Sequence, residues 1–82
     1  MTAPKIKTAF ALDQKTLLIT FISGETKRYD ISKLLSKDMF APLKNPGFFK
    51  NVKVETGGYA VYWNSAIDIS EYELWENGVT ES

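Results

Sequence analysis

Asp30 and Asp68 are the two residues whose type and setting could support acid/base chemistry. The chain has no His and no Cys, which removes the usual near-neutral general base, the cysteine nucleophile and the thiolate metal ligand. A two-carboxylate enzyme needs both groups in one cleft with pKa values pushed apart. The simpler interpretation is that Asp30 begins a helix and that Asp68 accepts backbone hydrogen bonds before the last helix. We therefore expect no catalytic residue, and keep an enzymatic or small-ligand-binding domain that uses Asp30 and Asp68 as the alternative.

Carboxylates and amides are the remaining candidates for metal ligands. They do not follow the Asp-x-Asp-x-Asp spacing of a calcium-binding loop. Gly57-Gly58 lies between two strand patterns and is not followed by a helix, so it predicts a hairpin turn rather than a phosphate-binding loop. We expect neither a metal nor a cofactor.

Lys5, Lys7 and Lys27 form a candidate basic face on the predicted strands. All ten basic residues of the chain precede residue 54, where they outnumber the acidic ones by six; residues 54–82 hold six acidic residues and no basic one. A nucleic-acid binder needs a basic surface that is not compensated nearby. Lysines on outward or edge strands also serve to prevent aggregation. Direct nucleic-acid binding is therefore disfavoured, and the sequence leaves open whether the opposite charges form separate patches.

The final predicted helix carries a candidate interaction surface of Tyr72, Glu73, Trp75 and Glu76. Aromatic side chains with polar tips are enriched at protein interfaces. Trp63, by contrast, is expected in the core. The acidic helix predicts a protein partner, either a basic protein or a second copy of the chain in a homodimer.

The first thirty residues have the pattern of three strands. Alternation from residue 6 predicts that Ile6, Thr8, Phe10 and Leu12 are buried and that Lys5, Lys7, Ala9 and Ala11 face outward. Residues 17–21 continue with a second strand, and a turn around Gly24 leads to a third strand over residues 26–29. These segments predict an antiparallel three-stranded meander.

The rest of the chain predicts short helices and a second hairpin. Asp30 is expected to cap a helix over 31–36, followed by a helical segment over 39–43 and a cap or turn at Asn45-Pro46-Gly47. Residues 51–63 have the pattern of a hairpin, and residues 66–69 of an extended stretch. Ser70 and Glu73 are spaced as a reciprocal capping box, Gly78 is expected to end the helix in a left-handed conformation, and residues 79–82 to fray.

These elements predict a single α+β domain over residues 1–82, with an ordered core over about residues 5–78. Eighty-two residues allow one domain with a limited core. No apolar run approaches the ~18 residues that a bilayer crossing needs, and the first residues lack the apolar region of a secretory signal. We expect no membrane association and a cytoplasmic location.

The spacing of several residues resembles a known family. The relevant segments are Phe21-x-x-Gly24-x-x-x-Arg28-Tyr29-Asp30, Leu34-Leu35, Phe40-x-x-Leu43 and Trp63-x-x-x-x-Asp68-Ile69-Ser70-x-x-x-Leu74. Together they resemble the bacterial domain of unknown function family 2442, in its standalone form, with Gly24, Asp30, Trp63, Asp68 and Leu74 as signature residues. Relatives tend to carry a Gly in the turn after the Trp, where this chain has Ser65 and Ala66.

The resemblance implies a small α+β fold and no established reaction. Members occur alone or joined to a helix-turn-helix domain, and they often lie beside small genes of toxin-like type. It therefore implies a non-enzymatic interaction or regulatory domain, such as the antitoxin-like partner of a small toxin-like protein. This chain has no helix-turn-helix after the family domain, so DNA binding by fused relatives does not carry over.

Overall fold

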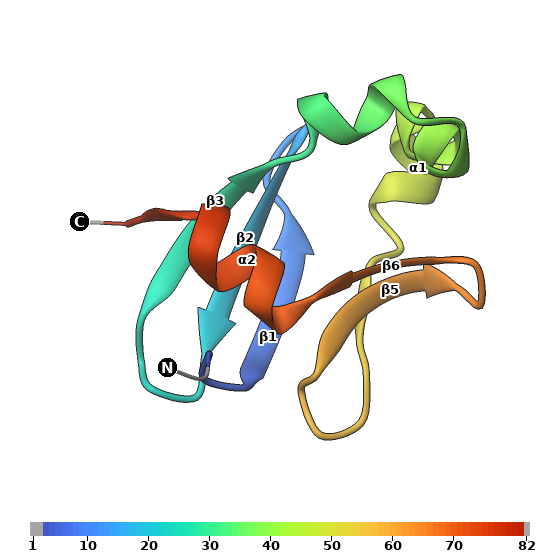
Figure 1. The fold of residues 1–82 in the computed structure, drawn as a ribbon. Helices are drawn as coiled ribbons and strands as arrows, with labels where there is room; N and C mark the ends of the chain where they lie inside the picture. Colours follow the sequence, from blue (N-terminus) through green and yellow to red (C-terminus); the bar gives the residue numbers. More distant parts are fainter. Residues whose placement is uncertain (1–2, 82) are drawn as a thin grey trace.

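The computed structural model describes residues 3–81 and contains two antiparallel sheets with short helices around one core (Figure 1). The first sheet has the order β1-β2-β3-β7, and the second has the order β4-β5-β6. The elements are β1 (Ile6–Ala11), β2 (Thr16–Phe21), β3 (Thr26–Asp30), η1 (Ser32–Ser36), η2 (Asp38–Lys44), α1 (Pro46–Phe49), β4 (Lys53–Val54), β5 (Ala60–Asn64), β6 (Ile67–Ser70), α2 (Glu71–Asn77) and β7 (Val79–Thr80). The predicted α+β class, meander, helical middle and second hairpin are confirmed.

The core fills the space between the two sheets and the helices. Leu17, Ile19 and Phe21 on β2 are fully buried, as their alternation predicts. The aromatic ring of Phe49 stacks on Trp63, with the ring centroids 6.0 Å apart. The indole N–H of Trp63 donates a 2.9 Å hydrogen bond to the Phe49 carbonyl oxygen, which satisfies the polar atom of this buried side chain. The core position predicted for Trp63 is confirmed.

Strand β1 faces the opposite way from the prediction over most of its length. Ile6 pairs with Phe21 and is buried, but the register shifts between Ile6 and Thr8. Such a bulge adds one residue to the strand and reverses the alternation beyond it. Ala9 and Ala11 therefore pack against the core, whereas Phe10 is 49% exposed. The predicted burial of Thr8, Phe10 and Leu12 was wrong, because the period-two pattern does not reveal the extra residue.

The end of the chain also differs from the predicted frayed tail. Val79 pairs with Arg28 and Thr80 with Lys27, so β7 adds a fourth strand to the meander. The backbone N–H of Glu81 continues the ladder by donating to the Thr26 carbonyl oxygen at 2.8 Å. Ser82 lies outside the described residues.

Helix α2 begins at the predicted Ser70 cap, but the predicted contact of the Glu73 carboxylate and the end of the helix differ. The Ser70 hydroxyl accepts a hydrogen bond from the Glu73 backbone N–H at 3.1 Å, which confirms this half of the capping box. The Glu73 carboxylate accepts from the Tyr29 hydroxyl at 2.8 Å. Gly78 has φ −77° and is extended rather than left-handed. A Cβ atom at Gly78 would lie 2.5 Å from the Leu74 carbonyl oxygen, so close approach is what favours glycine there.

The signature turn after Trp63 forms without glycine. The Asn64 side-chain oxygen accepts hydrogen bonds from the backbone N–H groups of Ala66 and Ile67, at 2.8 and 2.9 Å. An Asn side chain can organise a turn in this way without positive φ angles. No helix within residues 3–81 has the length and apolar character that a bilayer crossing requires.

Candidate functional site

The four residues of the predicted interaction surface point to different sides of α2. Tyr72 and Glu76, four residues apart, are both exposed, with Tyr72 at 58%. Glu73 is half-buried on the side that faces Tyr29, and Trp75 is half-buried against the first sheet. The structure therefore keeps Tyr72 and Glu76 together on the surface, and separates Glu73 from them.

Trp75 lies between the core and Lys27. Its ring meets Phe21 edge-on, with centroids 5.0 Å apart. The Lys27 ammonium lies 4.1 Å from the centroid of the Trp75 ring and donates a 2.6 Å hydrogen bond to the Trp75 carbonyl oxygen. Lys27 is only 9% exposed, because β3 points this side chain toward α2. The contacts with the face of the Trp75 ring and with the Trp75 carbonyl oxygen stabilise this buried cation.

The three lysines of the predicted basic face do not form one exposed surface. Lys27 is buried under α2, and Lys5 forms a 3.0 Å ion pair with Glu71. Lys7 is exposed in the β1 bulge. The prediction of a shared face was wrong, because it assumed that Lys27 points outward from β3.

The opposite charges of the two chain segments meet within the fold. Lys5 pairs with Glu71, and Arg28 forms two hydrogen bonds with the Glu81 carboxylate, one of them 3.1 Å long. Lys27 binds the backbone of the acidic helix. The surface around α2 is consequently mixed in charge, and purely electrostatic capture of a basic partner is not favoured there.

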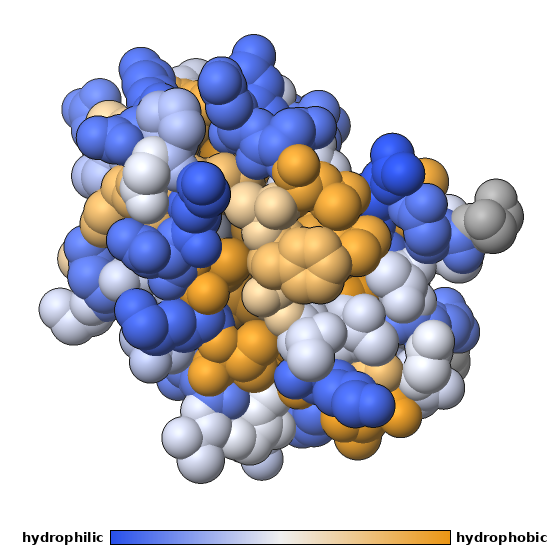
Figure 2. Space-filling model, turned by 180° about the vertical axis from the view of Figure 1, so that it is seen from behind, coloured by the Kyte–Doolittle hydropathy of each residue, from blue (hydrophilic) through white to orange (hydrophobic). Residues whose placement is uncertain are grey.

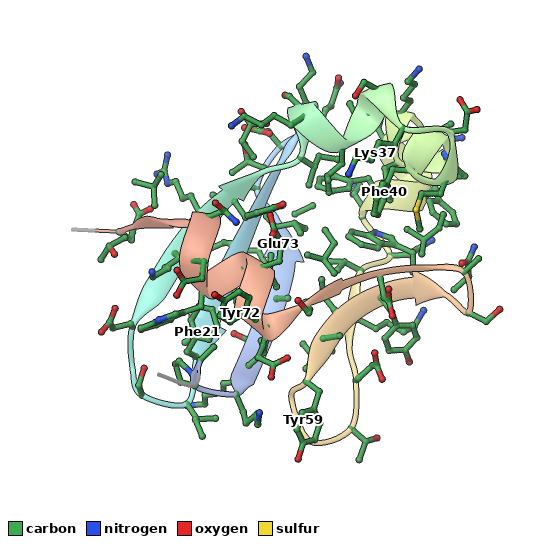
Figure 3. All side chains as sticks on the ribbon, viewed as in Figure 1. Phe21, Lys37, Phe40, Tyr59, Tyr72 and Glu73 are labelled. Carbon is green, nitrogen blue, oxygen red and sulfur yellow. The ribbon has the colours of Figure 1, made fainter. Side chains whose placement is uncertain are left out.

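A groove lies between α2, β3 and η1, with Tyr29 and Glu73 at its centre. The cavity has a volume of about 610 Å³, and Lys33, Lys37 and Leu34 line its η1 side. Figure 3 shows Lys37 and Glu73, which line this groove, and Phe40, which lines a smaller cavity that shares both residues. Burial and the hydrogen bond to Glu73 raise the pKa of Tyr29 well above its usual range. Tyr29 is therefore a proton donor in a hydrogen bond near neutral pH, and not a general base.

Asp30 and Asp68 line different cavities. Asp30 borders the groove beside α2, where its carboxylate accepts a 2.7 Å hydrogen bond from the Ser32 backbone N–H, and hydrogen bonding to Ser32 lowers the Asp30 pKa. Asp68 is exposed on β6. Of five surface cavities of residues 3–81, none is lined by both carboxylates. This geometry does not support two-carboxylate catalysis by Asp30 and Asp68.

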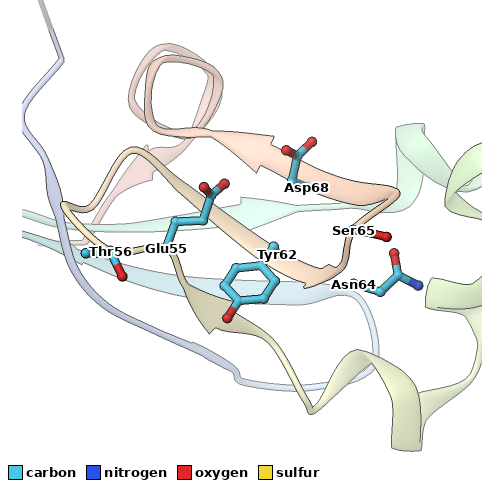
Figure 4. Close-up of a pocket in the computed structure, with 6 residues that line it drawn as sticks. All are labelled: Glu55, Thr56, Tyr62, Asn64, Ser65 and Asp68. Atoms are coloured by element: carbon cyan, nitrogen blue, oxygen red, sulfur yellow. The ribbon is translucent and has the colours of Figure 1, made fainter.

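Asp68 borders a small cavity that shares Tyr29, Lys37 and Glu73 with the groove beside α2, and it also lines an open depression on the outer face of the second sheet. The depression has a volume of about 540 Å³, and the residues that line it are Glu55, Thr56, Tyr62, Asn64, Ser65 and Asp68 (Figure 4). Both of its carboxylates belong to exposed residues. No group of three potential metal-ligating side chains occurs among residues 3–81, here or elsewhere.

Tyr59 joins Tyr72 in what we call the aromatic surface, formed by Lys5, Tyr59, Glu71, Tyr72 and Glu76. Tyr59 is 58% exposed and its carbonyl oxygen accepts a 2.9 Å hydrogen bond from the Glu71 backbone N–H. The Lys5 ammonium lies 4.2 Å from the centroid of the Tyr59 ring. Figure 3 shows Tyr72 on α2 and Tyr59 below it, at the hairpin turn. The sequence has more aromatic residues than its core needs, Tyr59 among them, but the interaction surface predicted from it lay on the final helix alone and did not include Tyr59.

The comparison with protein families confirms the family that the sequence resembles. The model of the family described as protein of unknown function (DUF2442) matches residues 6–80. The chain belongs to this family. No curated protein and no solved structure matches it. In this DUF2442 domain, Leu74 is fully buried, Trp63 holds α1 against β5, and Gly24 occupies a turn with φ +95°. Leu74, Trp63 and Gly24 therefore have structural roles, whereas Asp30 is the last residue of β3 and Asp68 lies within β6.

Proposed function

We propose that this protein is a non-enzymatic interaction or regulatory domain of the bacterial cytoplasm, the antitoxin-like partner of a small toxin-like protein. The observation that carries the proposal is the aromatic surface, where two tyrosine rings are each 58% exposed beside α2. Aromatic side chains provide large contact area at a low cost in conformational entropy, which is why they are frequent in binding surfaces.

The backbone around the two tyrosines supports a preorganised binding surface. Tyr59 follows the Gly57-Gly58 turn, and its carbonyl oxygen is bonded to the first residue of α2. Lys5 bridges the two parts by contacting both the Tyr59 ring and the Glu71 carboxylate. A surface that is already ordered loses less entropy when it binds.

The charges of this surface support a partner of mixed polarity. Lys5 compensates Glu71, whereas Glu76 remains exposed beside Tyr72. Aromatic residues surrounded by polar and charged groups are the usual composition of a non-obligate interface. The partner's contact surface should therefore combine apolar side chains with a cation opposite Glu76.

Co-expression tests this function. The protein encoded next to this chain, tested as the toxin-like partner, is expressed with it, and growth and copurification are measured. We expect the wild-type chain to relieve growth inhibition and to copurify, and the Tyr59→Ala/Tyr72→Ala variant to lose both by at least tenfold, since aromatic anchors carry much of the binding energy. Met39→Ala is the matched control, because Met39 is 56% exposed on η2. Equal binding by the double variant would exclude this surface, and a neighbour that does not bind the wild-type chain would contradict the function.

A further inference from the structure

The face of the first sheet that points away from α2 is not covered by any described element. Cross-strand partners lie on the same face of a sheet, so the register places Phe10, Leu18, Arg28 and Val79 in one row across β1, β2, β3 and β7. Thr8, Thr20 and Thr26 form the neighbouring row. We call these seven residues the open sheet face. Seen from behind, the molecule has an apolar patch near its centre (Figure 2).

β1 turns its small side chains toward the core and its large apolar side chains toward solvent, which the stability of the fold alone does not explain. Ala9 and Ala11 pack toward the core, while the larger Phe10 and Leu12 are 49% and 43% exposed. A fold optimised only for its own core would bury the larger side chains, because burial of a Phe or Leu side chain contributes about 1.5–3 kcal/mol. The bulge between Ile6 and Thr8 thus directs bulky apolar groups to the open sheet face.

The composition of the open sheet face suits association with a surface of the same kind. Arg28 is the only charged residue among the seven, and its guanidinium is already paired with Glu81. Asp30, two residues further along β3 on the same side of the sheet, adds one negative charge, and its carboxylate accepts a hydrogen bond from the Ser32 backbone N–H. Depletion of charge around aromatic and apolar residues is typical of the centre of an interface. A basic or acidic partner would find little to pair with, whereas a second copy offers the same near-neutral surface.

The edges of this sheet are less suited to association than its face. The β1 edge carries the bulge and the exposed Lys7, and the Ile6 backbone N–H already donates a 2.9 Å hydrogen bond to Gly58. The opposite edge, β7, has only two residues. Bulges, lysines and short edge strands prevent pairing of one edge with another.

We propose that the open sheet face binds the same face of a second copy of this chain, around a two-fold axis parallel to the strands between β2 and β3. This axis reverses the order of the strands in the facing copy, so Phe10 lies against Val79 of the second copy and Leu18 against the aliphatic stem of Arg28. An axis perpendicular to the strands would place the two Arg28 side chains opposite each other. Two stacked sheets of this kind pack ~10 Å apart.

The area of the open sheet face indicates a weak dimer. Three strands ~4.8 Å apart and about five residues long, with the two residues of β7 beside them, give a patch of at most ~19 by ~17 Å. This is below the roughly 800 Å² of accessible surface per partner that a stable interface buries, out of 5103 Å² for the chain. A Kd on the order of 0.1 mM is the expected range for an interface this small. The open sheet face is on the side of the first sheet that points away from α2, whereas the aromatic surface is beside α2. The proposed dimer uses different residues from the proposed partner-binding surface, so it does not depend on the proposed function.

Sedimentation equilibrium of the full chain from about 10 µM to about 1 mM tests the dimer. We expect the wild-type chain to reach the dimer mass and Phe10→Lys to weaken association at least tenfold. Met39→Lys is the matched control, since Met39 is 56% exposed on η2, outside the first sheet. Unchanged thermal unfolding of the variants would show that they are folded. A wild-type chain that remains monomeric throughout would overturn the proposal, as would a Phe10→Lys chain that still dimerises.

A mixing experiment tests the orientation of the two copies. Val79→Glu and Phe10→Lys should each be monomeric, and an equimolar mixture should form a heterodimer, because Lys at position 10 then faces Glu at position 79 of the other chain. Phe10 and Val79 remain in contact on the other side of the axis. A mixture that stays monomeric would exclude this axis. If Phe10→Lys abolished copurification of the toxin-like protein while the wild-type chain stayed monomeric, a foreign partner would replace the second copy as the occupant.

Discussion

The Lys27 ammonium lies against the face of the Trp75 ring, 4.1 Å from its centroid, and also donates a hydrogen bond to the Trp75 carbonyl oxygen. One lysine thereby connects β3 to α2 by two different interactions. The contact also joins the basic part of the chain to its acidic end. Association between these two segments of one molecule accounts for part of the neutral total charge.

Lys27→Met should destabilise the fold by about 1–2 kcal/mol, because it removes a partly desolvated cation–π contact and a charged hydrogen-bond donor. The Met side chain keeps most of the apolar stem, so the loss measures mainly the ammonium group. Urea unfolding followed by Trp fluorescence gives the free energy of unfolding. Lys53→Met, at an exposed position on β4, is the control and should change stability little. Equal effects of both variants would show that the contact with Trp75 contributes nothing specific.

Tyr29→Phe should destabilise the fold by about 1–2 kcal/mol, because the half-buried Glu73 carboxylate loses its hydrogen-bond donor. The folded-state pKa of Tyr29 is raised, so this group contributes stability that is present below pH ~10 and falls as the unfolded chain ionises at higher pH. Unfolding measured from pH 7 to pH 11 should show a smaller decline for Tyr29→Phe than for the wild type. A decline of equal size in both proteins would contradict this role of Tyr29.

The two Gly→Ala substitutions at positions 24 and 58 should differ in cost. Both residues have positive φ, +95° at Gly24 and +76° at Gly58, so both substitutions add backbone strain of about 1 kcal/mol or more. At Gly24 the added Cβ has open space, whereas at Gly58 it would lie 2.5 Å from the Ile6 carbonyl oxygen. Gly58→Ala must therefore also separate β1 from the second hairpin. Thermal unfolding should show a clearly larger loss for Gly58→Ala, and similar losses would exclude the steric contribution.

Some features of the fold follow from local patterns and others depend on distant contacts. The buried side of β2 and the Ser70 cap were predicted from neighbouring residues and are confirmed, because alternation and capping are local. The outward turn of Phe10 depends on a bulge, and the pairing of Val79 with Arg28 depends on residues about fifty positions apart. The local alternation of apolar and polar residues indicates neither the bulge in β1 nor the pairing of β7 with β3.

In the candidate surfaces, too, some features follow from the local sequence and others depend on distant contacts. Exposure of Tyr72 and Glu76 follows from their positions on an amphipathic helix whose Leu74 is buried. The burial of Lys27 could not be predicted from strand alternation alone, because the register of β3 and the position of Trp75 above it are set by the tertiary fold. For the same reason the two segments of opposite charge were not recognised as direct neighbours.

Trp63→Phe should destabilise the fold by about 1–3 kcal/mol, with a readout that separates packing from hydrogen bonding. The Phe ring can keep the stacked contact with Phe49, but the Phe49 carbonyl oxygen loses the indole donor at 2.9 Å. Because this bond joins the end of α1 to β5, amide hydrogen exchange should accelerate in residues 46–52 more than in β2. Leu18→Ala, a change on the open sheet face, serves as a control for nonspecific loosening. Uniform acceleration across the chain would indicate a general loss of stability, and would show that Trp63 does not hold α1 in place through this bond.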